Sequence, residues 1–181
     1  MTIVEAILQL LRRKPTSRIL ACAPSNSAAD LIASRLTSLG SSVLFRLYAP
    51  SRAKEQVPTE LRDYVFQNRD GYFSIPPKRK MQGFKVVVTT CVSAALVSGV
   101  GIPRGHYSHI FVDEAAQATE PEVMIAIKIM ADRNTNVVLS GDPKQLGPII
   151  RSSVAREFGL EKSYMERLME REVYDEGHDT R

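Results

Sequence analysis

The sequence has few cysteines and histidines, and these shortages exclude several classes of protein. Its two cysteines, Cys22 and Cys91, cannot build a disulfide framework, and both lie in apolar runs typical of buried strands. Its three histidines have no cysteine or histidine neighbours at the spacing of zinc ligands. We therefore expect buried free thiols, no zinc site and a reducing compartment.

The sequence also lacks a long hydrophobic run. No stretch approaches the roughly 18 consecutive apolar residues that span a membrane. Glu5 interrupts the apolar run near the N-terminus, and Arg12 and Arg13 follow that run, which is the reverse of the order in a signal peptide. We expect no membrane partner and a cytosolic or nuclear protein.

The chain has no strong excess of charge of either sign. Its formal net charge is +4, and its contents of 44% hydrophobic and 24% charged residues are ordinary globular values. A mild positive charge suits a polyanionic partner, and it equally suits a solvated surface that is slightly cationic. The length of 181 residues suffices for one domain with a sizeable core.

Apolar runs of strand length alternate with helical patterns along the chain. We predict strands over residues 18–23, 84–90, 109–112 and 136–140, and helices over 3–11, 27–39, 119–132 and 154–171. Continuous apolar strands that alternate with helices are typical of a parallel α/β sheet covered on both faces. Ligands bind such sheets beyond the carboxyl ends of the strands.

Local signals mark the ends of two of these helices. Ser27 and Asp30 resemble a capping pair at the start of the second helix, and Gly40 follows its end. Thr119 and Glu122 suit a capping box at the start of the third. We expect both helices to begin at these residues.

Residues 41–83 differ from their surroundings, with four prolines, many charges and scattered apolar residues. This composition predicts a surface insertion with one or two short helices, one of them around residues 59–68. Solvated loop charge is the ordinary role of its basic residues, although they could flank a nucleic-acid path. These residues are Arg46, Arg52, Lys54, Lys78, Arg79 and Lys80.

Two strand ends carry the side chains that a nucleotide hydrolase needs. Asp113 and Glu114 follow one strand, and Gln145 lies in the Gly-Asp-Pro-Lys-Gln turn after the next. One carboxylate can hold Mg²⁺, a second can position water, and an amide can contact a phosphate. Alone, the acids could simply begin a helix and the amide could be a turn residue. The occurrence of both segments after successive strands favours the catalytic interpretation.

Small polar residues follow the two other strands. Pro24–Asn26 comes after the first strand, and Thr89–Cys91 ends the second. Short hydroxyl and amide donors suit contacts with phosphates, which carry no sequence information. Helix capping and the β-propensity of threonine are the ordinary alternatives for these residues.

Together these segments resemble motifs of the superfamily 1 helicases, in the group of the nonsense-mediated-decay and RNA-silencing helicases. APSN at 23–26 is similar to motif Ia, and VVTTC at 87–91 to the next segment that contacts nucleic acid. VDEAAQATEPE at 112–122 is similar to motif II, and GDPKQLGPII at 141–150 to motif III. Residues 101–128 most resemble the silencing-associated cytoplasmic RNA helicases.

The resemblance implies a RecA-like first motor domain over residues 1–172 and a connector from 173 towards a second such domain. It implies coupling of ATP hydrolysis to 5′-to-3′ movement on single-stranded RNA, in a monomeric cytoplasmic parent recruited by silencing or decay proteins. It assigns Mg²⁺ to Asp113, water to Glu114, nucleotide contacts to Gly141, Asp142 and Gln145, and RNA contacts to Pro24, Ser25, Asn26, Thr89 and Thr90. A DNA substrate remains open within the superfamily.

The sequence contains no Gly-x-x-x-x-Gly-Lys-Ser/Thr phosphate loop. In the family this loop, preceded by an interior strand, ends just before a helix like residues 2–11. We therefore expect an incomplete RecA-like domain that hydrolyses no ATP alone, arising from a fragment, a truncated isoform or a gene model begun at an internal methionine. A truncated regulator that binds RNA or protein, and a fragment that does not fold alone, are the alternatives.

Overall fold

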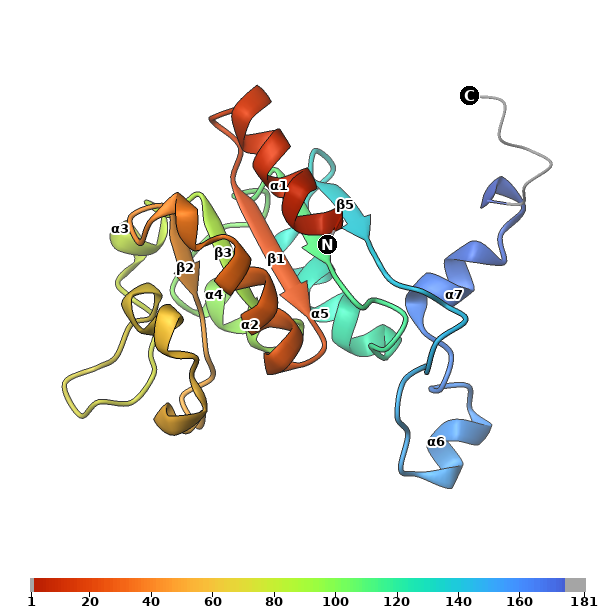
Figure 1. Ribbon diagram of the computed structural model, residues 1–181. Helices are drawn as coiled ribbons and strands as arrows, with labels where there is room; N and C mark the ends of the chain where they lie inside the picture. The colour runs from red at the N-terminus through yellow and green to blue at the C-terminus, as the bar shows by residue number, and fades with distance from the viewer. Residues whose placement is uncertain (1, 175–181) are drawn as a thin grey trace.

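Five parallel strands form the centre of the structure, a computed structural model that describes residues 2–174 (Figure 1). They are β1 (Ile19–Ala23), β2 (Leu44–Arg46), β3 (Val86–Thr90), β4 (His109–Val112) and β5 (Asn136–Leu139). Their order across the sheet is β2-β3-β1-β4-β5, and every pairing between neighbours is parallel. The predicted parallel α/β fold and its four strands are confirmed.

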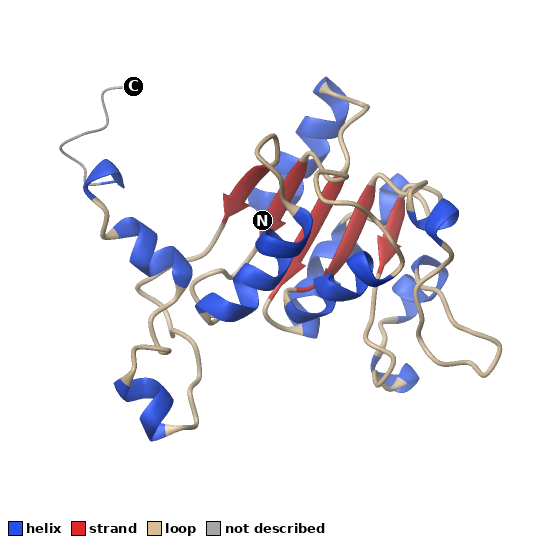
Figure 2. Ribbon diagram, turned by 180° about the vertical axis from the view of Figure 1, so that it is seen from behind, coloured by secondary structure: helices blue, strands red, loops and turns tan. Residues whose placement is uncertain are grey.

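Helices cover both faces of the sheet and separate its side chains into two cores. The helices α1 (Thr2–Arg13) and α2 (Asn26–Arg35) pack on one face, in front of β1 in Figure 1. The short η4 (Val92–Ala94), α4 (Ala95–Gly99) and α5 (Glu120–Met130) pack on the other, seen from behind in Figure 2. Because both faces are buried, the strands are continuously apolar.

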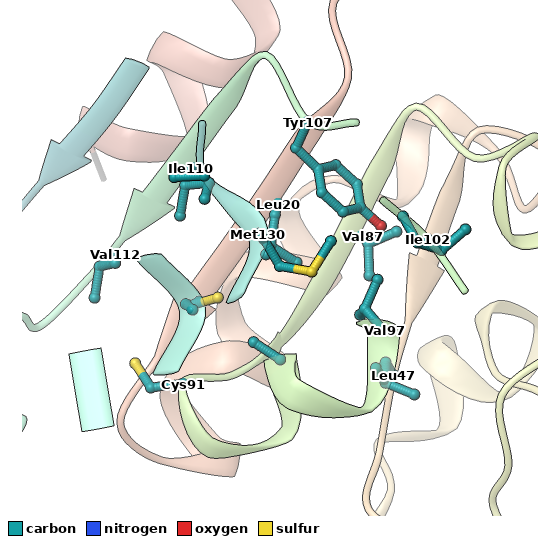
Figure 3. Close-up of a cluster of buried hydrophobic side chains, with 14 of the residues drawn as sticks. Leu20, Leu47, Val87, Cys91, Val97, Ile102, Tyr107, Ile110, Val112 and Met130 are labelled. Carbon is teal, nitrogen blue, oxygen red and sulfur yellow. The ribbon is translucent and has the colours of Figure 1, made fainter. Parts of the chain in front are cut away.

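The core beneath α4 and α5 is formed by alternate strand residues. Figure 3 shows Leu20, Val87 and Ile110 directed towards Met130 and Val97. The neighbours of Leu20 and Ile110 along the strands, Ala21 and Phe111, face the opposite core. This alternation follows from the two-residue repeat of a strand.

The two helix starts differ in how well local signals predicted them. The capping box of Thr119 and Glu122 is present, and it confirms the prediction for α5. The prediction that Ser27 and Asp30 cap α2 was wrong, because Ser25 is the N-cap and its Oγ accepts from the Ala28 N–H at 3.1 Å. Asp30 is instead buried and forms an ion pair with Arg46.

The segment 41–83 was wrongly predicted to be a surface insertion throughout. Its first part forms β2, an edge strand of the sheet, whose three residues are all buried. Further along lie η2 (Lys54–Gln56), η3 (Thr59–Tyr64) and α3 (Lys78–Met81). The position of η3 agrees with the short helix predicted around residues 59–68.

The expected helix over residues 154–171 is two helices, α6 (Ser153–Glu157) and α7 (Tyr164–Met169), followed by η5 (Glu172–Tyr174). Gly159 separates them with φ +81°, a left-handed conformation that favours glycine. Most of the expected connector, residues 175–181, lies outside the described residues. Between residues 2 and 174, no helix is long and apolar enough to cross a membrane.

We expect both cysteines to resist thiol reagents in the folded protein. Cys22 and Cys91 are buried, and burial raises the pKa of Cys91 to about 12 and that of Cys22 well above its usual value. Since the thiolate is the reactive form, DTNB at mildly alkaline pH should label them only after a denaturant is added. The exposed variant Ser98→Cys should react at once. Rapid labelling of both native thiols would contradict this packing.

Candidate nucleotide and nucleic-acid site

The carboxyl ends of four parallel strands lie along one edge of the sheet. The register aligns Thr90 of β3 with Ala23 of β1, and Val112 of β4 with Leu139 of β5. The predicted RNA-contacting residues therefore lie at the end of β3 and after β1, and the predicted catalytic residues follow β4 and β5. The structure thus brings the predicted residues to one edge, in two adjacent halves.

The turn after β4 places two carboxylates in different environments. Asp113 is 8% exposed, and its N–H donates to the Cys22 carbonyl of β1 at 2.9 Å. Glu114 is half-buried, and its Oε2 accepts from Gln117 Nε2 at 2.9 Å. Its φ of +52° makes it the one non-glycine residue with a left-handed backbone between residues 2 and 174. Such strained positions cluster at functional sites, and the tight turn separates the two carboxylates.

Backbone contacts join this turn to the loop after β5. The Ala115 N–H donates to the Ser140 carbonyl at 2.8 Å, and the Ser140 N–H donates to the Val112 carbonyl at 2.8 Å. A Cβ atom at Gly141 would lie 3.0 Å from the backbone nitrogens of both Ala115 and Ala116. Glycine therefore allows the two loops to approach closely.

Gln145 lies in an exposed turn organised by Asp142. The Asp142 carboxylate accepts from the Lys144 N–H at 2.9 Å and from Gln145 Nε2 at 3.1 Å, as in an Asx turn. Within residues 2–174, no hydrogen bond joins Gln145 to Asp113 or Glu114. The structure places Gln145 on the loop next to the carboxylates and leaves it accessible.

The arrangement around Asp113 is compatible with Mg²⁺. This ion commonly uses one or two carboxylates and takes its other ligands from water and substrate phosphates. In the described part of the chain, no group of three or more His, Cys, Asp or Glu side chains could hold a metal by itself. A single carboxylate at a strand end therefore suits an ion shared with a bound phosphate.

Three residues at the other half of the edge present polar groups towards solvent. Ser25 is exposed, while Asn26 is half-buried at the first turn of α2. Thr90 is partly exposed, and its hydroxyl donates to Ser93 Oγ at 2.9 Å. The helix N-terminus adds free N–H groups and a partial positive charge, which favour phosphates.

Thr89 does not belong to this polar surface. Its side chain is fully buried, and its hydroxyl donates to the Leu47 carbonyl at 3.1 Å. Successive residues of a strand face opposite sides, so Thr89 shares the side of Val87, in the core beneath α4 and α5, whereas Thr90 is the last residue of β3 and is partly exposed. The prediction that the Thr89 side chain contacts RNA is wrong for this structure.

An open cavity of about 270 Å³ connects the two halves of the edge. It is lined by Pro24, Ser25, Gln117, Thr119, Glu122, Leu146, Gly147 and Ile149. Its walls come from the loops after β1, β4 and β5 and from the first turn of α5. Pro24, in the loop after β1, is one of the residues that line the cavity. A ligand in one half of the site would therefore adjoin the loops of the other half.

A buried polar network that was not predicted from the sequence lies beside Asn26. Arg46, expected to be a solvated cation, is 1% exposed and pairs with Asp30 at 2.7 Å. Burial lowers the pKa of Arg46, and the Asp30 carboxylate raises it again. The other basic residues of the segment, Lys54, Lys78, Arg79 and Lys80, are exposed, and Arg52 is partly buried. No local signal reveals Arg46, because Asp30 lies in a different element.

Gly141→Ala should lower the free energy of unfolding by about 1–3 kcal/mol, the usual effect of inserting a methyl group into a closely packed contact. The added Cβ would meet backbone atoms, which cannot move aside as a flexible side chain can. Urea unfolding measures the change. Gly99→Ala is the matched control, since a Cβ there meets nothing within 4 Å. Equal effects of the two substitutions would contradict the close approach of the loops.

Comparison with known proteins identifies the family of this chain. A family described as AAA domain matches residues 78–153. Human RNA helicase Mov10l1 is 43% identical over 176 residues, covering 96% of this chain and 14% of that protein. The putative helicase mov-10-B.1 of Danio rerio is 46% identical over 183 residues, covering 97% and 18%. The probable RNA helicase armi of Drosophila melanogaster is 35% identical over 193 residues, covering 96% and 16%.

A solved structure has a similar fold at low sequence identity. It is the type ISP restriction-modification enzyme LlaGI, in complex with a DNA substrate mimic. The TM-score is 0.51 at 14% identity, covering 84% of this chain and 15% of that one. This likeness concerns the fold alone. The chain spans 14–18% of the length of the three helicases described above, and it belongs to the family of superfamily 1 RNA helicases.

Proposed function

We propose that this chain is part of an ATP-dependent motor that moves 5′ to 3′ along single-stranded RNA. The main support is the arrangement of the sheet edge, where a strained Asp-Glu turn adjoins a row of small polar side chains. The relatives described as RNA helicases favour RNA over DNA. Residues 1–172 would be part of the first RecA-like domain of this motor.

In the nucleotide half, each predicted residue has a separate role. Asp113 would hold Mg²⁺, which neutralises the charge of the phosphates when bound. Glu114 would orient the attacking water and accept its proton, because its carboxylate is more accessible than that of Asp113. Gln145 would contact the γ-phosphate from the neighbouring loop, beside Gly141 and Asp142.

In the nucleic-acid half, Ser25, Asn26 and Thr90 would contact the RNA backbone. Their donors are small and lie beside the N-terminus of α2, which suits binding without sequence preference. Pro24 would form part of the wall between this half and the nucleotide half.

The 181-residue chain alone should hydrolyse no ATP. Its sequence contains no Gly-Lys-Ser/Thr loop to surround the phosphates, and that loop supplies most of the backbone donors in such sites. We propose as a second candidate function, for the chain by itself, an RNA-binding module without ATPase activity, which the absence of the phosphate-loop motif from this sequence favours. We further propose a cytoplasmic, monomeric parent protein recruited by silencing or decay proteins, on the strength of the family resemblance.

Binding of labelled oligouridine, followed by fluorescence anisotropy, tests the nucleic-acid half directly. The chain should bind single-stranded RNA more tightly than the matching DNA, with an affinity that falls as salt rises. Ser25→Ala and Thr90→Val should weaken binding, whereas Ser98→Ala, on the exposed part of α4, should not. Absence of RNA binding, or equal binding of the Ser25→Ala variant, would contradict the proposed contacts.

A further inference from the structure

We propose that Arg46 is a positioning residue that orients the Asn26 side chain so that its amide NH₂ group donates to an RNA phosphate. This inference rests on the proposed RNA-binding function of the sheet edge. Arg46 itself lies behind the loop between β1 and α2, at the end of β2, and has no direct access to RNA.

The Arg46 guanidinium is held firmly in place. Its Nε donates to Asp30 Oδ1 at 2.8 Å, and its Nη1 donates to the Leu47 carbonyl at 2.7 Å. The guanidinium carbon lies 4.0 Å from the centre of the Tyr48 ring, and the Tyr48 hydroxyl donates to Asp30 at 2.7 Å. A group fixed by this many contacts can determine the orientation of its neighbour.

That neighbour is Asn26. Arg46 Nη2 donates to Asn26 Oδ1 at 3.0 Å. A guanidinium has donors and no acceptor, so the oxygen of the Asn26 amide must face it. The amide NH₂ group, on the other side of the Asn26 Cγ atom, is then directed away from Arg46.

The Asn26 NH₂ group is available to a ligand. It donates no hydrogen bond within residues 2–174, and it is not among their buried polar atoms without a partner. It adjoins the N-terminus of α2, a helix of 10 residues, where free backbone N–H groups and the helix dipole favour an anion. A neutral donor at this position suits a phosphate oxygen.

Arg46 is buried and pairs with Asp30 at 2.7 Å, so we expect it to act on RNA binding through the orientation of Asn26. Its effect should therefore depend entirely on Asn26. A lysine at position 46 keeps the positive charge beside Asp30, but its single ammonium group cannot reproduce the fork that reaches both Asp30 and Asn26. Arg46→Lys is thus a suitable test variant.

The test is a double-mutant cycle on the 181-residue chain, with labelled oligouridine binding as the readout. Asn26→Ala should weaken binding by about 10- to 100-fold, the effect of losing a hydrogen bond to a charged group. Arg46→Lys should weaken it by a similar factor, and the double variant should bind no more weakly than Asn26→Ala. If the two losses multiply instead, Arg46 acts through the general fold and the inference is wrong.

Two further outcomes are decisive. If the wild-type chain binds RNA and Arg46→Lys binds equally well, the inference fails while the proposed function stands. If Asn26→Ala binds equally well, both the inference and the proposed Asn26 contact fail. If the wild-type chain binds no RNA, the proposed function fails and the inference fails with it. Should Arg46→Lys not fold, the neutral pair Asp30→Asn/Arg46→Met replaces it in the same cycle, since it leaves no unpaired buried charge.

Discussion

Glu114→Gln should abolish RNA-stimulated ATP turnover in a helicase polypeptide that contains both this chain and a Gly-Lys-Thr phosphate loop, while ATP and RNA binding persist. The amide has the shape of the carboxylate but cannot accept a proton from water. Loss of a general base lowers the rate by about 100- to 10,000-fold. Asp113→Asn should differ, because it should weaken the Mg²⁺ dependence of nucleotide binding as well. A coupled phosphate-release assay measures the turnover.

Glu120→Gln is the matched control for Glu114→Gln. Glu120 lies in the first turn of α5 and pairs with Arg167 at 2.6 Å, away from the strained turn. Its replacement should leave turnover near the wild-type rate. Turnover by Glu114→Gln within tenfold of the wild type would contradict the assigned role of this carboxylate. The same polypeptides should unwind duplexes with a 5′ single-stranded RNA overhang, which tests the direction of movement.

Arg46→Met should lower the free energy of unfolding by about 3–5 kcal/mol, because it removes the cation that contacts the buried Asp30 carboxylate most closely. The guanidinium is fully buried, and it also supplies hydrogen bonds to Leu47 and Asn26. The double variant Asp30→Asn/Arg46→Met should recover much of this loss, since it removes both charges together. Urea unfolding curves measure both effects.

Arg52→Met is the control that distinguishes loss of the buried Arg46–Asp30 pair from loss of any nearby positive charge. Arg52 lies 4.0 Å from Asp30, and its side chain is 21% exposed. Such a partly solvated pair contributes about 1 kcal/mol or less. A loss from Arg52→Met as large as that from Arg46→Met would contradict the central role of Arg46 in this network.

The parts of the fold that depend on local sequence were predicted well. β4 has the predicted bounds, 109–112, and the Thr119–Glu122 box needs only residues of the same helix turn. β2 was not predicted, since it is short, follows no clear alternation and contains an arginine. The burial of that arginine, Arg46, depends on Asp30, which lies 16 residues earlier in another element. Only the tertiary structure therefore reveals that β2 is buried.

The location of the candidate site could be predicted from the sequence, whereas its detailed geometry could not. Parallel strands bring their carboxyl ends to one edge, so motifs found at strand ends were expected to meet there. The left-handed backbone of Glu114 could not be predicted, because glutamate is not typical of that conformation. The close contact at Gly141 could not be predicted either, because it depends on the packing of two loops. The RNA contact predicted for the Thr89 side chain was wrong because composition does not tell which of two adjacent threonines is fully buried.

We propose that this chain carries hydrolytic and RNA-contacting residues of a motor, and its sequence contains no Gly-Lys-Ser/Thr phosphate loop. A titration of a fluorescent ATP analogue with Mg²⁺ tests this proposal, on the 181-residue chain and on a longer helicase polypeptide that includes a Gly-Lys-Thr loop. We expect binding by the longer polypeptide and none by the chain alone. Tight, Mg²⁺-dependent binding by the 181-residue chain would contradict this expectation, and would mean that Asp113, Glu114 and Gln145 act with other phosphate ligands.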